Sequence, residues 1–276
     1  MDEKVIKKIV KDGYGEIAKR GGSCCDSGNS CCGPVDLTQD ISRKIGYSEE
    51  EINAAPEGAN LGLGCGNPVA LASLRKGEIV LDLGSGAGFD CFLAAHKVGE
   101  KGKVIGVDMT PEMIEKAKEN AKNSNYENVE FRLGEIEKLP VIDNSVDVVM
   151  SNCVINLSPD KGKVFQEAFR VLKPSGRLMI SDIVLLNELP KVIKESVEAY
   201  IGCVSGAAMK DEYLRKIKAS GFDDVRVIEE TVFPFEFIAN DPAVKRMIED
   251  LGLKAGEAKK LAHSAVSIKV HAVKPN

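Results

Sequence analysis

Short apolar runs alternate with helix-like segments between residues 77 and 185. Five of the runs are rich in β-branched or other apolar side chains, as buried strands are. They cover residues 78–84, 103–108, 128–134, 145–152 and 176–184. Between them lie segments with the spacing of amphipathic helices, at residues 90–98, 110–124 and 162–176. Strand–helix alternation of this length predicts an α/β fold with a doubly wound, mostly parallel sheet.

The segment from 110 to 124 (TPEMIEKAKENAKNS) carries the clearest helix signals. Thr110 is suited to cap its N-terminus, and Pro111 fits the first helical turn. Glu112 adds negative charge near the positive end of the helix dipole. We therefore expect the threonine side chain to cap this helix.

The flanking segments are less regular. Residues 4–20 carry apolar side chains at helix spacing, whereas residues 21–34 (GGSCCDSGNSCCGP) are typical of a loop. Residues 35–56 predict one or two short helices that end before Pro56. The C-terminal region predicts helices near 190–201 and 209–220, a glycine-rich break at 202–206, and strands at 224–232 and 266–273.

These patterns divide the chain into three parts. We expect an N-terminal helical and cysteine-rich segment at 1–75 and an α/β core at 76–185. Residues 186–276 are then an α+β cap that completes the sheet and covers the site.

Composition argues against several classes of partner. The chain has 276 residues, 29% charged side chains and a formal net charge of −5. It has no basic stretch and no apolar run of about 18 residues, so neither nucleic acid nor a membrane is expected to bind. The first residues lack the apolar part of a secretory signal, and we expect a cytoplasmic protein. In a reducing compartment, its eight cysteines are expected to be buried, metal-binding or catalytic rather than bridged.

The strongest chemical motif, VLDLGSGAGFD at 80–90, follows the first predicted strand. A dinucleotide-binding fingerprint would continue G-x-G-x-x-G, but Phe89 stands where its third glycine belongs. This departure argues against a pyrophosphate ligand, and Asp82 before the glycines suits a ligand with an ammonium group. Asp108 ends the second strand, where a carboxylate can bind both hydroxyls of a ribose. A nucleoside joined to an amino acid, without phosphates, is S-adenosylmethionine.

The motif DLGSGAG, with an aspartate at the end of the next strand, resembles the class I S-adenosylmethionine-dependent methyltransferases over roughly residues 75–185. The resemblance implies a Rossmann-like sheet and a glycine turn along the methionine part of the cofactor. It also implies that Met109 borders the adenine and that GEIEKLP (134–140) forms the adenine loop. The implied cofactor-binding residues are Asp82, Gly84, Ser85, Gly86, Gly88, Asp108, Met109, Glu135, Ile136 and Asn152.

Three cysteines lie in irregular segments where an acceptor would bind. Cys153 follows the fourth predicted strand, Cys203 lies in a glycine-rich break, and Cys65 lies between two glycines in NLGLGCGNP. Each has a second interpretation as a small buried apolar residue, and we favour that interpretation for Cys91 on its apolar helix. Three thiolates suit trivalent arsenic, which keeps a lone pair directed away from them. The run CCDSGNSCC lacks the usual spacing of a zinc site, so no bound metal cofactor is expected.

The motifs NLGLGCGNP, DLGSGAGFD, SNCVINLSP and IGCVSGA, in this order, resemble the arsenite methyltransferases over nearly the whole chain. The resemblance implies that Cys65, Cys153 and Cys203 bind arsenic, either as arsenite or from its thiol conjugates. It also implies an N-terminal cysteine that forms a disulfide with Cys65 and supplies electrons, replenished by a thioredoxin- or glutathione-like reductant. The candidates for that cysteine are Cys24, Cys25, Cys31 and Cys32, with Cys31 and Cys32 preferred.

The expected reaction is in-line attack of the arsenic lone pair on the sulfonium methyl group, followed by thiol reduction of the pentavalent product, a route to arsenic detoxification. It needs no base, and none of the three histidines lies in a motif. Gly64 and Gly66 are expected to let the intervening cysteine swing between arsenic and its disulfide partner. Tyr14 is assigned equally to a lid or to the core. The alternatives are a C- or O-methyltransferase of a quinone- or sterol-like molecule and a thiol protein that sequesters metalloid.

Overall fold

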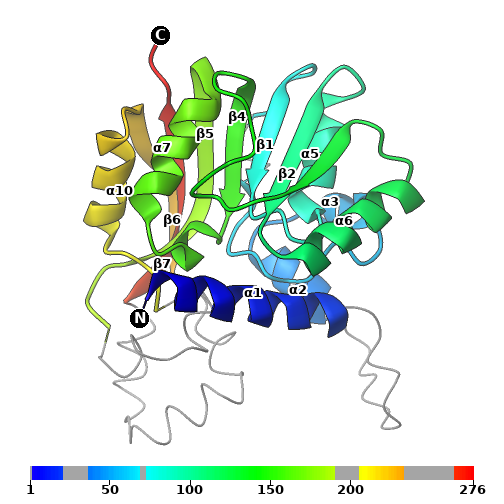
Figure 1. Cartoon of the computed structure of the whole chain (residues 1–276), viewed down its shortest axis with the longest axis horizontal. Coiled ribbons are helices and arrows are strands. Elements are labelled where there is room, and N and C mark those ends of the chain that lie inside the picture. Colours follow the sequence, from blue (N-terminus) through cyan, green and yellow to red (C-terminus); the bar gives the residue numbers. More distant parts are fainter. Residues whose placement is uncertain (1, 21–36, 69–72, 190–204, 233–263) are drawn as a thin grey trace, which may run out of the picture.

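The computed structural model describes residues 2–20, 37–68, 73–189, 205–232 and 264–276 (Figure 1). Seven α-helices and a 3₁₀ helix, η1, lie in these ranges. They are α1 (Glu3–Arg20), α2 (Leu37–Lys44), α3 (Glu49–Ala54), α5 (Phe89–Val98), α6 (Pro111–Asn123), η1 (Ile155–Leu157), α7 (Lys161–Val171) and α10 (Lys210–Ala219). The strands are β1 (Ile79–Leu83), β2 (Lys103–Asp108), β3 (Val129–Leu133), β4 (Val146–Asn152), β5 (Leu172–Leu185), β6 (Asp223–Val232) and β7 (Ala265–Val273).

The seven strands form one sheet in the order β3-β2-β1-β4-β5-β7-β6. The first five pair in parallel, whereas β7 runs antiparallel to both β5 and β6. This arrangement confirms the predicted doubly wound, mostly parallel α/β sheet. The C-terminal strands join the same sheet, because β7 inserts between β5 and β6.

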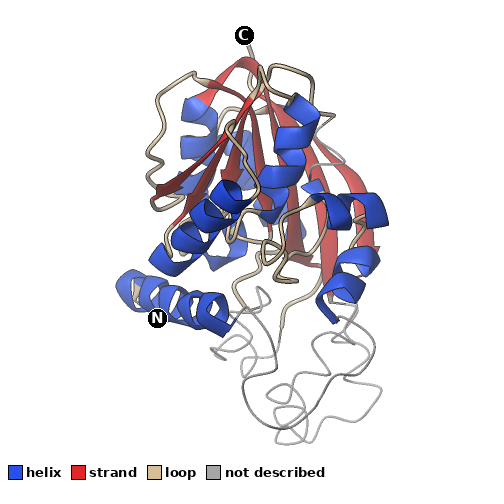
Figure 2. Ribbon diagram, turned by 90° about the vertical axis from the view of Figure 1, so that its right-hand side faces the viewer, coloured by secondary structure: helices blue, strands red, loops and turns tan. Residues whose placement is uncertain are grey.

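Helices cover both faces of the sheet (Figure 2). On one face, α7 and α10 pack their apolar side chains against the sheet, and Phe165 and Tyr213 are fully buried there. On the other face, α3, α5 and α6 form a second apolar cluster around Phe92. Successive residues of a strand point to opposite faces, so Val80 packs in the second cluster and Leu81 in the first.

Helix α1 lies across the end of the sheet at which the parallel strands finish (Figure 1). It contacts α6, and its Val10 is buried in a third apolar cluster together with Cys65 and Cys153. The helix therefore closes the edge at which open α/β sheets bind their ligands.

Two local predictions were wrong. The helix expected over 162–176 ends at Val171, because Pro174 cannot continue a helix and disfavours helical backbone at Lys173. Strand β5 accordingly begins at Leu172 rather than 176. Thr110 occupies the N-cap position of α6, but its side chain makes no capping hydrogen bond. The carboxylate of Asp108 accepts the Thr110 N–H instead, at 2.8 Å.

The predicted helices within 35–56 and 209–220 are present, as are both C-terminal strands. The helix expected at 190–201 lies outside the described residues, as does most of the break at 202–206. None of the helices in the described ranges is long and apolar enough to cross a membrane.

Candidate active site

A glycine turn connects β1 to α5 beside a cavity. Gly84, Gly86 and Gly88 all have positive φ, a conformation that side chains with a Cβ rarely adopt. A Cβ on Gly84 would lie 2.3 Å from the side chain of Val154, so packing here also requires a residue without a Cβ. Gly84 and Gly86 line the cavity.

Gly88 has a different position from its two neighbours. It forms the N-cap of α5, and a Cβ there would lie 2.7 Å from both Phe92 and Phe131. It is outside the cavity lining, so glycine is explained at this position by its positive φ and by packing between α5 and β3.

Three aspartates line the cavity next to the turn. Burial raises the pKa of Asp90 to about 6, although hydrogen bonds from Tyr47 and Asn152 oppose the shift. Burial and the neighbouring Asp90 raise the pKa of Asp82 well above its usual range, while the Cys91 thiol donates to this carboxylate at 3.2 Å. A ligand with positive charge would relieve the mutual repulsion of these carboxylates. The cavity wall therefore suits a cation.

Asp108, the third of these aspartates, ends β2 as the strand pattern predicted. Its two carboxylate oxygens accept the backbone N–H groups of Gly86 at 3.0 Å and Thr110 at 2.8 Å. The nearby Ser85 Oγ is buried and has no hydrogen-bond partner among the described residues. A buried hydroxyl without a partner is costly, so a polar ligand is expected to satisfy it. Carboxylates, a glycine turn and an unpaired hydroxyl together fit S-adenosylmethionine.

The opposite wall of the cavity comes from α1 and the loop after β3. Lys7, Val10 and Tyr14 of α1 line it, so Tyr14 does face the cavity. From the loop, Ile136 and Glu137 line the cavity. Glu135 is not among the lining residues, and its carboxylate pairs with Lys7 at 2.8 Å. Met109, in contrast, lines the cavity beside Asp108.

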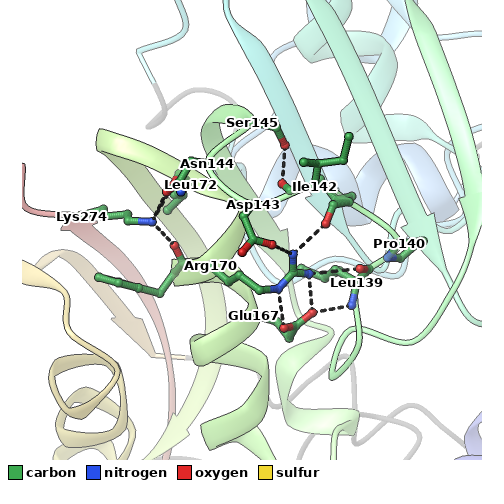
Figure 3. A network of polar contacts seen from close by, with 12 residues as sticks. Leu139, Pro140, Ile142, Asp143, Asn144, Ser145, Glu167, Arg170, Leu172 and Lys274 are labelled. Carbon is green, nitrogen blue, oxygen red and sulfur yellow. Dashed lines mark hydrogen bonds and ion pairs between the residues drawn. The ribbon is translucent and has the colours of Figure 1, made fainter.

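A network around Arg170 of α7 anchors this loop (Figure 3). The guanidinium donates to the carbonyl of Val141 at 2.8 Å and to that of Leu139 at 3.2 Å. It also pairs with Asp143 and Glu167, and Glu167 accepts the N–H of Leu139 at 2.7 Å. A residue outside the cavity thus holds the backbone on which Ile136 and Glu137 are placed.

Two thiols meet at the end of β4. Cys65, Cys153 and Asp182 each place one donor atom within 4.8 Å of the other two, and all three residues are buried. Cys153 also lines the cavity. Its φ of 59° is unusual for a residue with a side chain, and its N–H donates to the Ser181 carbonyl at 2.8 Å. Such a conformation persists only where the surrounding structure holds it, and active sites are one place where this is common.

Asp182 was not predicted as a site residue. One of its oxygens accepts from Asn156 Nδ2 at 2.8 Å and from the N–H of Ile183 at 2.9 Å. The other accepts from the Tyr213 hydroxyl at 2.9 Å. Burial raises its pKa to about 7 despite these donors. It lies within an apolar run of β5, and nothing in the local sequence indicates that it reaches the thiols.

The other predicted cysteines divide into two groups. Cys91 is fully buried on α5 in an apolar cluster, in agreement with its interpretation as a packing residue. Cys203, Cys24, Cys25, Cys31 and Cys32 lie outside the described residues.

Sequence reasoning also missed Tyr47 and Asp90, which hydrogen-bond each other at 2.6 Å across 43 positions. Asp90 ends the glycine motif, which was the only available signal.

Asn152, predicted to bind cofactor, lines the cavity. Its side-chain amide also forms hydrogen bonds with Cys65, Tyr47, Gly66 and Asp90. Neither of the two histidines among the described residues, His96 and His271, lines the cavity.

The strand order and the cavity at the glycine turn are those of a known class. Residues 74–221 match the family model described as a methyltransferase domain. The fold and the site thus define a class I S-adenosylmethionine-dependent methyltransferase.

Comparison with individual proteins narrows the class. The arsenite methyltransferase of Halobacterium salinarum is 45% identical over 95% of this chain and 68% of its own length. The human arsenite methyltransferase is 33% identical over 94% of this chain and 68% of its own. The crystal structure of an arsenic(III) S-adenosylmethionine methyltransferase from Chlamydomonas reinhardtii matches with a TM-score of 0.62 and 31% identity, over 86% of this chain and 73% of that one. The chain belongs to the arsenite methyltransferase family. It spans about two thirds of the length of these two curated relatives.

Proposed function

We propose that this protein methylates trivalent arsenic held by cysteine thiolates, with S-adenosylmethionine as methyl donor. The observation that carries the proposal is the meeting of Cys65 and Cys153, 88 positions apart in the chain, at the edge of the cavity that fits the donor. Relatives whose names state this activity support it. Thiolates are soft ligands, and they suit a soft trivalent metalloid better than oxygen donors do.

The residues of the cavity bind and orient the donor. The glycine turn brings backbone close to the ligand, Asp82 and Asp90 offer charge to an ammonium group, and Asp108 lies at the position that binds ribose in this fold. S-adenosylmethionine supplies a methyl group on a sulfonium, and the arsenic lone pair is the nucleophile. Holding the two reactants together is then the main contribution of the protein to the rate.

The acceptor side of the site needs no general base. A lone pair on arsenic carries no proton, in contrast to a hydroxyl acceptor, which commonly requires a base within hydrogen-bond reach. The thiols must lose their protons when arsenic binds, so binding releases protons to solvent. Methyl transfer leaves pentavalent arsenic, and its reduction takes two electrons. We assign these to a cysteine pair that includes Cys65, which becomes a disulfide and is restored by an external dithiol.

Arsenic completes its coordination with a third thiolate in this proposal, and Cys203 is assigned that part on the family resemblance. Within the described residues, the third potential ligand group beside the two thiols is the Asp182 carboxylate.

The deciding experiment is an assay with arsenite, S-adenosylmethionine and a thiol reductant, with methylated arsenic species measured by chromatography and mass spectrometry. Wild type should produce them. Cys153→Ser should lower the rate by about 100-fold or more, because a hydroxyl does not replace a thiolate as an arsenic ligand. The matched control is Cys91→Ser, at a buried thiol of α5 that is absent from the cavity lining. Because a serine hydroxyl can still donate to Asp82, this variant should stay within about threefold of wild type.

Absence of product from wild type, or full activity in Cys153→Ser, would contradict the proposal. Tight arsenite binding without any methylated product would instead support the sequestering alternative.

A further inference from the structure

The side-chain amide of Asn152, at the end of β4, joins the cofactor cavity to the Cys65 segment. Its Oδ1 accepts the Cys65 N–H at 3.0 Å, and its Nδ2 donates to the Gly66 carbonyl at 2.9 Å. The same Nδ2 lies 3.0 Å from Asp90 Oδ2 and 2.9 Å from the Tyr47 hydroxyl. One end of the amide therefore contacts the backbone that carries a thiol, and the other contacts a carboxylate of the cavity wall.

The packing leaves this amide little freedom. A Cβ on Gly64 would lie 2.5 Å from Asn152 Nδ2, so the segment approaches the amide as closely as glycine permits. The Tyr47 hydroxyl donates to Asp90 Oδ1 at 2.6 Å and accepts from Asn152. Tyr47 is 4% exposed. Rotation of the amide by half a turn would direct its oxygen at the Asp90 carboxylate and its NH₂ at the Cys65 N–H, and both contacts would become repulsive.

We propose that Asn152 is a positioning residue that holds Cys65 beside Cys153 and makes arsenite affinity depend on whether the cofactor cavity is filled. The inference rests on the proposed function, because it names Cys65 as an arsenic ligand. A ligand that contacts Asp90 and Tyr47 acts on two of the groups that hold the amide in place, and the amide in turn holds the Cys65 backbone. Coupling between two binding equilibria is reciprocal, so bound arsenite must tighten cofactor binding by the same factor.

The chain offers a matched control on the other side of the same cysteine. Ser267 of β7 donates its hydroxyl to the Cys65 carbonyl at 2.8 Å. Ser267 also holds Cys65, but it is absent from the cavity lining. Its removal should therefore loosen the thiol and leave the connection to the cofactor intact.

The experiment is calorimetric titration with arsenite, with and without saturating S-adenosylhomocysteine, in a phosphine reductant because free thiols compete for arsenic. In wild type, S-adenosylhomocysteine should tighten arsenite binding by about fivefold or more. In Asn152→Ala, arsenite binding without cofactor should weaken by about tenfold and the coupling should fall to near one. Ser267→Ala should also bind arsenite more weakly, yet retain the coupling of wild type.

A second variant covers a failure of Asn152→Ala to fold, which thermal unfolding would reveal. Tyr47→Phe removes the hydroxyl between Asp90 and Asn152 without touching Cys65, so its coupling should fall while arsenite affinity in the absence of cofactor changes little. A merely structural role would move affinity and stability but leave the coupling factor at its wild-type value.

If the wild-type protein methylates arsenite but its arsenite affinity does not depend on bound cofactor, the inference is overturned and the proposed function stays intact. Equal coupling in wild type and Asn152→Ala would overturn it as well. Failure of wild type to bind arsenite would instead remove the proposed function, and with it this inference.

Discussion

At the residue scale, the two glycines that flank Cys65 are explained by contact. Neither Gly64 nor Gly66 has a positive φ, so residue types other than glycine could adopt the backbone conformation at both positions. A Cβ on Gly66, however, would lie 1.9 Å from Ser181 Oγ, as one on Gly64 would meet Asn152. Glycine is used here for close approach. Hydrogen bonds hold the N–H and the carbonyl of Cys65 in this structure, so the expected swing stays a prediction and would have to move the side chain or break these bonds.

Gly66→Ala tests this explanation. The overlap with Ser181 should displace the segment, lower the free energy of unfolding by about 1–3 kcal/mol and weaken arsenite binding more than cofactor binding. Chemical denaturation and calorimetric titration measure the two effects. Gly162→Ala in α7 is the control, because the nearest atom to its Cβ is an aspartate oxygen at 3.3 Å, and alanine there should be neutral or slightly stabilising. Equal affinity for arsenite in Gly66→Ala and wild type would refute the explanation.

At the scale of elements, the loop between β3 and β4 depends on α7. The residues that it contributes to the cavity are followed by backbone carbonyls bound to Arg170, at Leu139 and Val141. Hydrogen bonds from a charged donor to backbone are among the stronger polar contacts in proteins. A helix on one face of the sheet thus fixes a binding loop at its edge.

Arg170→Ala should therefore weaken cofactor binding by about threefold to tenfold and destabilise the fold by about 1–2 kcal/mol. Its control is Lys163→Ala on the same helix, whose side chain is 57% exposed and pairs with the neighbouring Asp160 at 3.1 Å. Such an exposed pair contributes little. Calorimetry with S-adenosylhomocysteine gives the affinities, and loss of equal size in both variants would show that the network does not act on the loop.

At the scale of the whole molecule, buried carboxylates make stability depend on pH. Burial raises the pKa of Asp182 to about 7 and that of Asp90 to about 6, from a value of 3.8 in both cases. Between the ordinary pKa of 3.8 and the raised pKa of each carboxyl, the folded state binds more protons than the unfolded state. The free energy of unfolding must then fall as pH rises through this window.

We expect the free energy of unfolding of the ligand-free protein to decrease by about 2–4 kcal/mol from pH 5 to pH 7.5. Urea denaturation at the two values measures the change. In Asp182→Asn the decrease should be smaller, since the residue that titrates around neutrality has been removed. An unchanged slope in that variant would mean that the carboxyl does not titrate in this range.

Much of the architecture was accessible from local patterns. Apolar runs, three of which stop at glycine or aspartate, located five parallel strands, and the aspartate at the end of β2 was recognisable by its position alone. The helix end before Pro174 and the cap of α6 were misjudged. At the first place the helical spacing of apolar residues competed with Pro174, which ended the helix. At the second, the Asp108 carboxylate made a hydrogen bond at the start of α6 where a threonine cap was expected.

The candidate site was less accessible, because its members come from distant parts of the chain. Cys65 and Cys153 were named together as arsenic ligands from their motifs and a family resemblance, whereas Asp182 and Tyr47 carry no signal beyond being polar residues in otherwise ordinary segments. A side chain enters a site by its direction on a strand and by what packs over it. Neither property can be derived from residues nearby in sequence.

By itself, the amino-acid sequence determined the strand–helix alternation, the glycine turn and the acidic residues at strand ends, because these depend on backbone preferences and on periods of two and 3.6 residues. Only the tertiary structure decided that α1 closes the cavity, that Cys65 meets Cys153 beside Asp182, and that one asparagine contacts both sites. Those contacts arise when distant segments share a buried edge of the sheet, where packing and hydrogen bonding act across the fold.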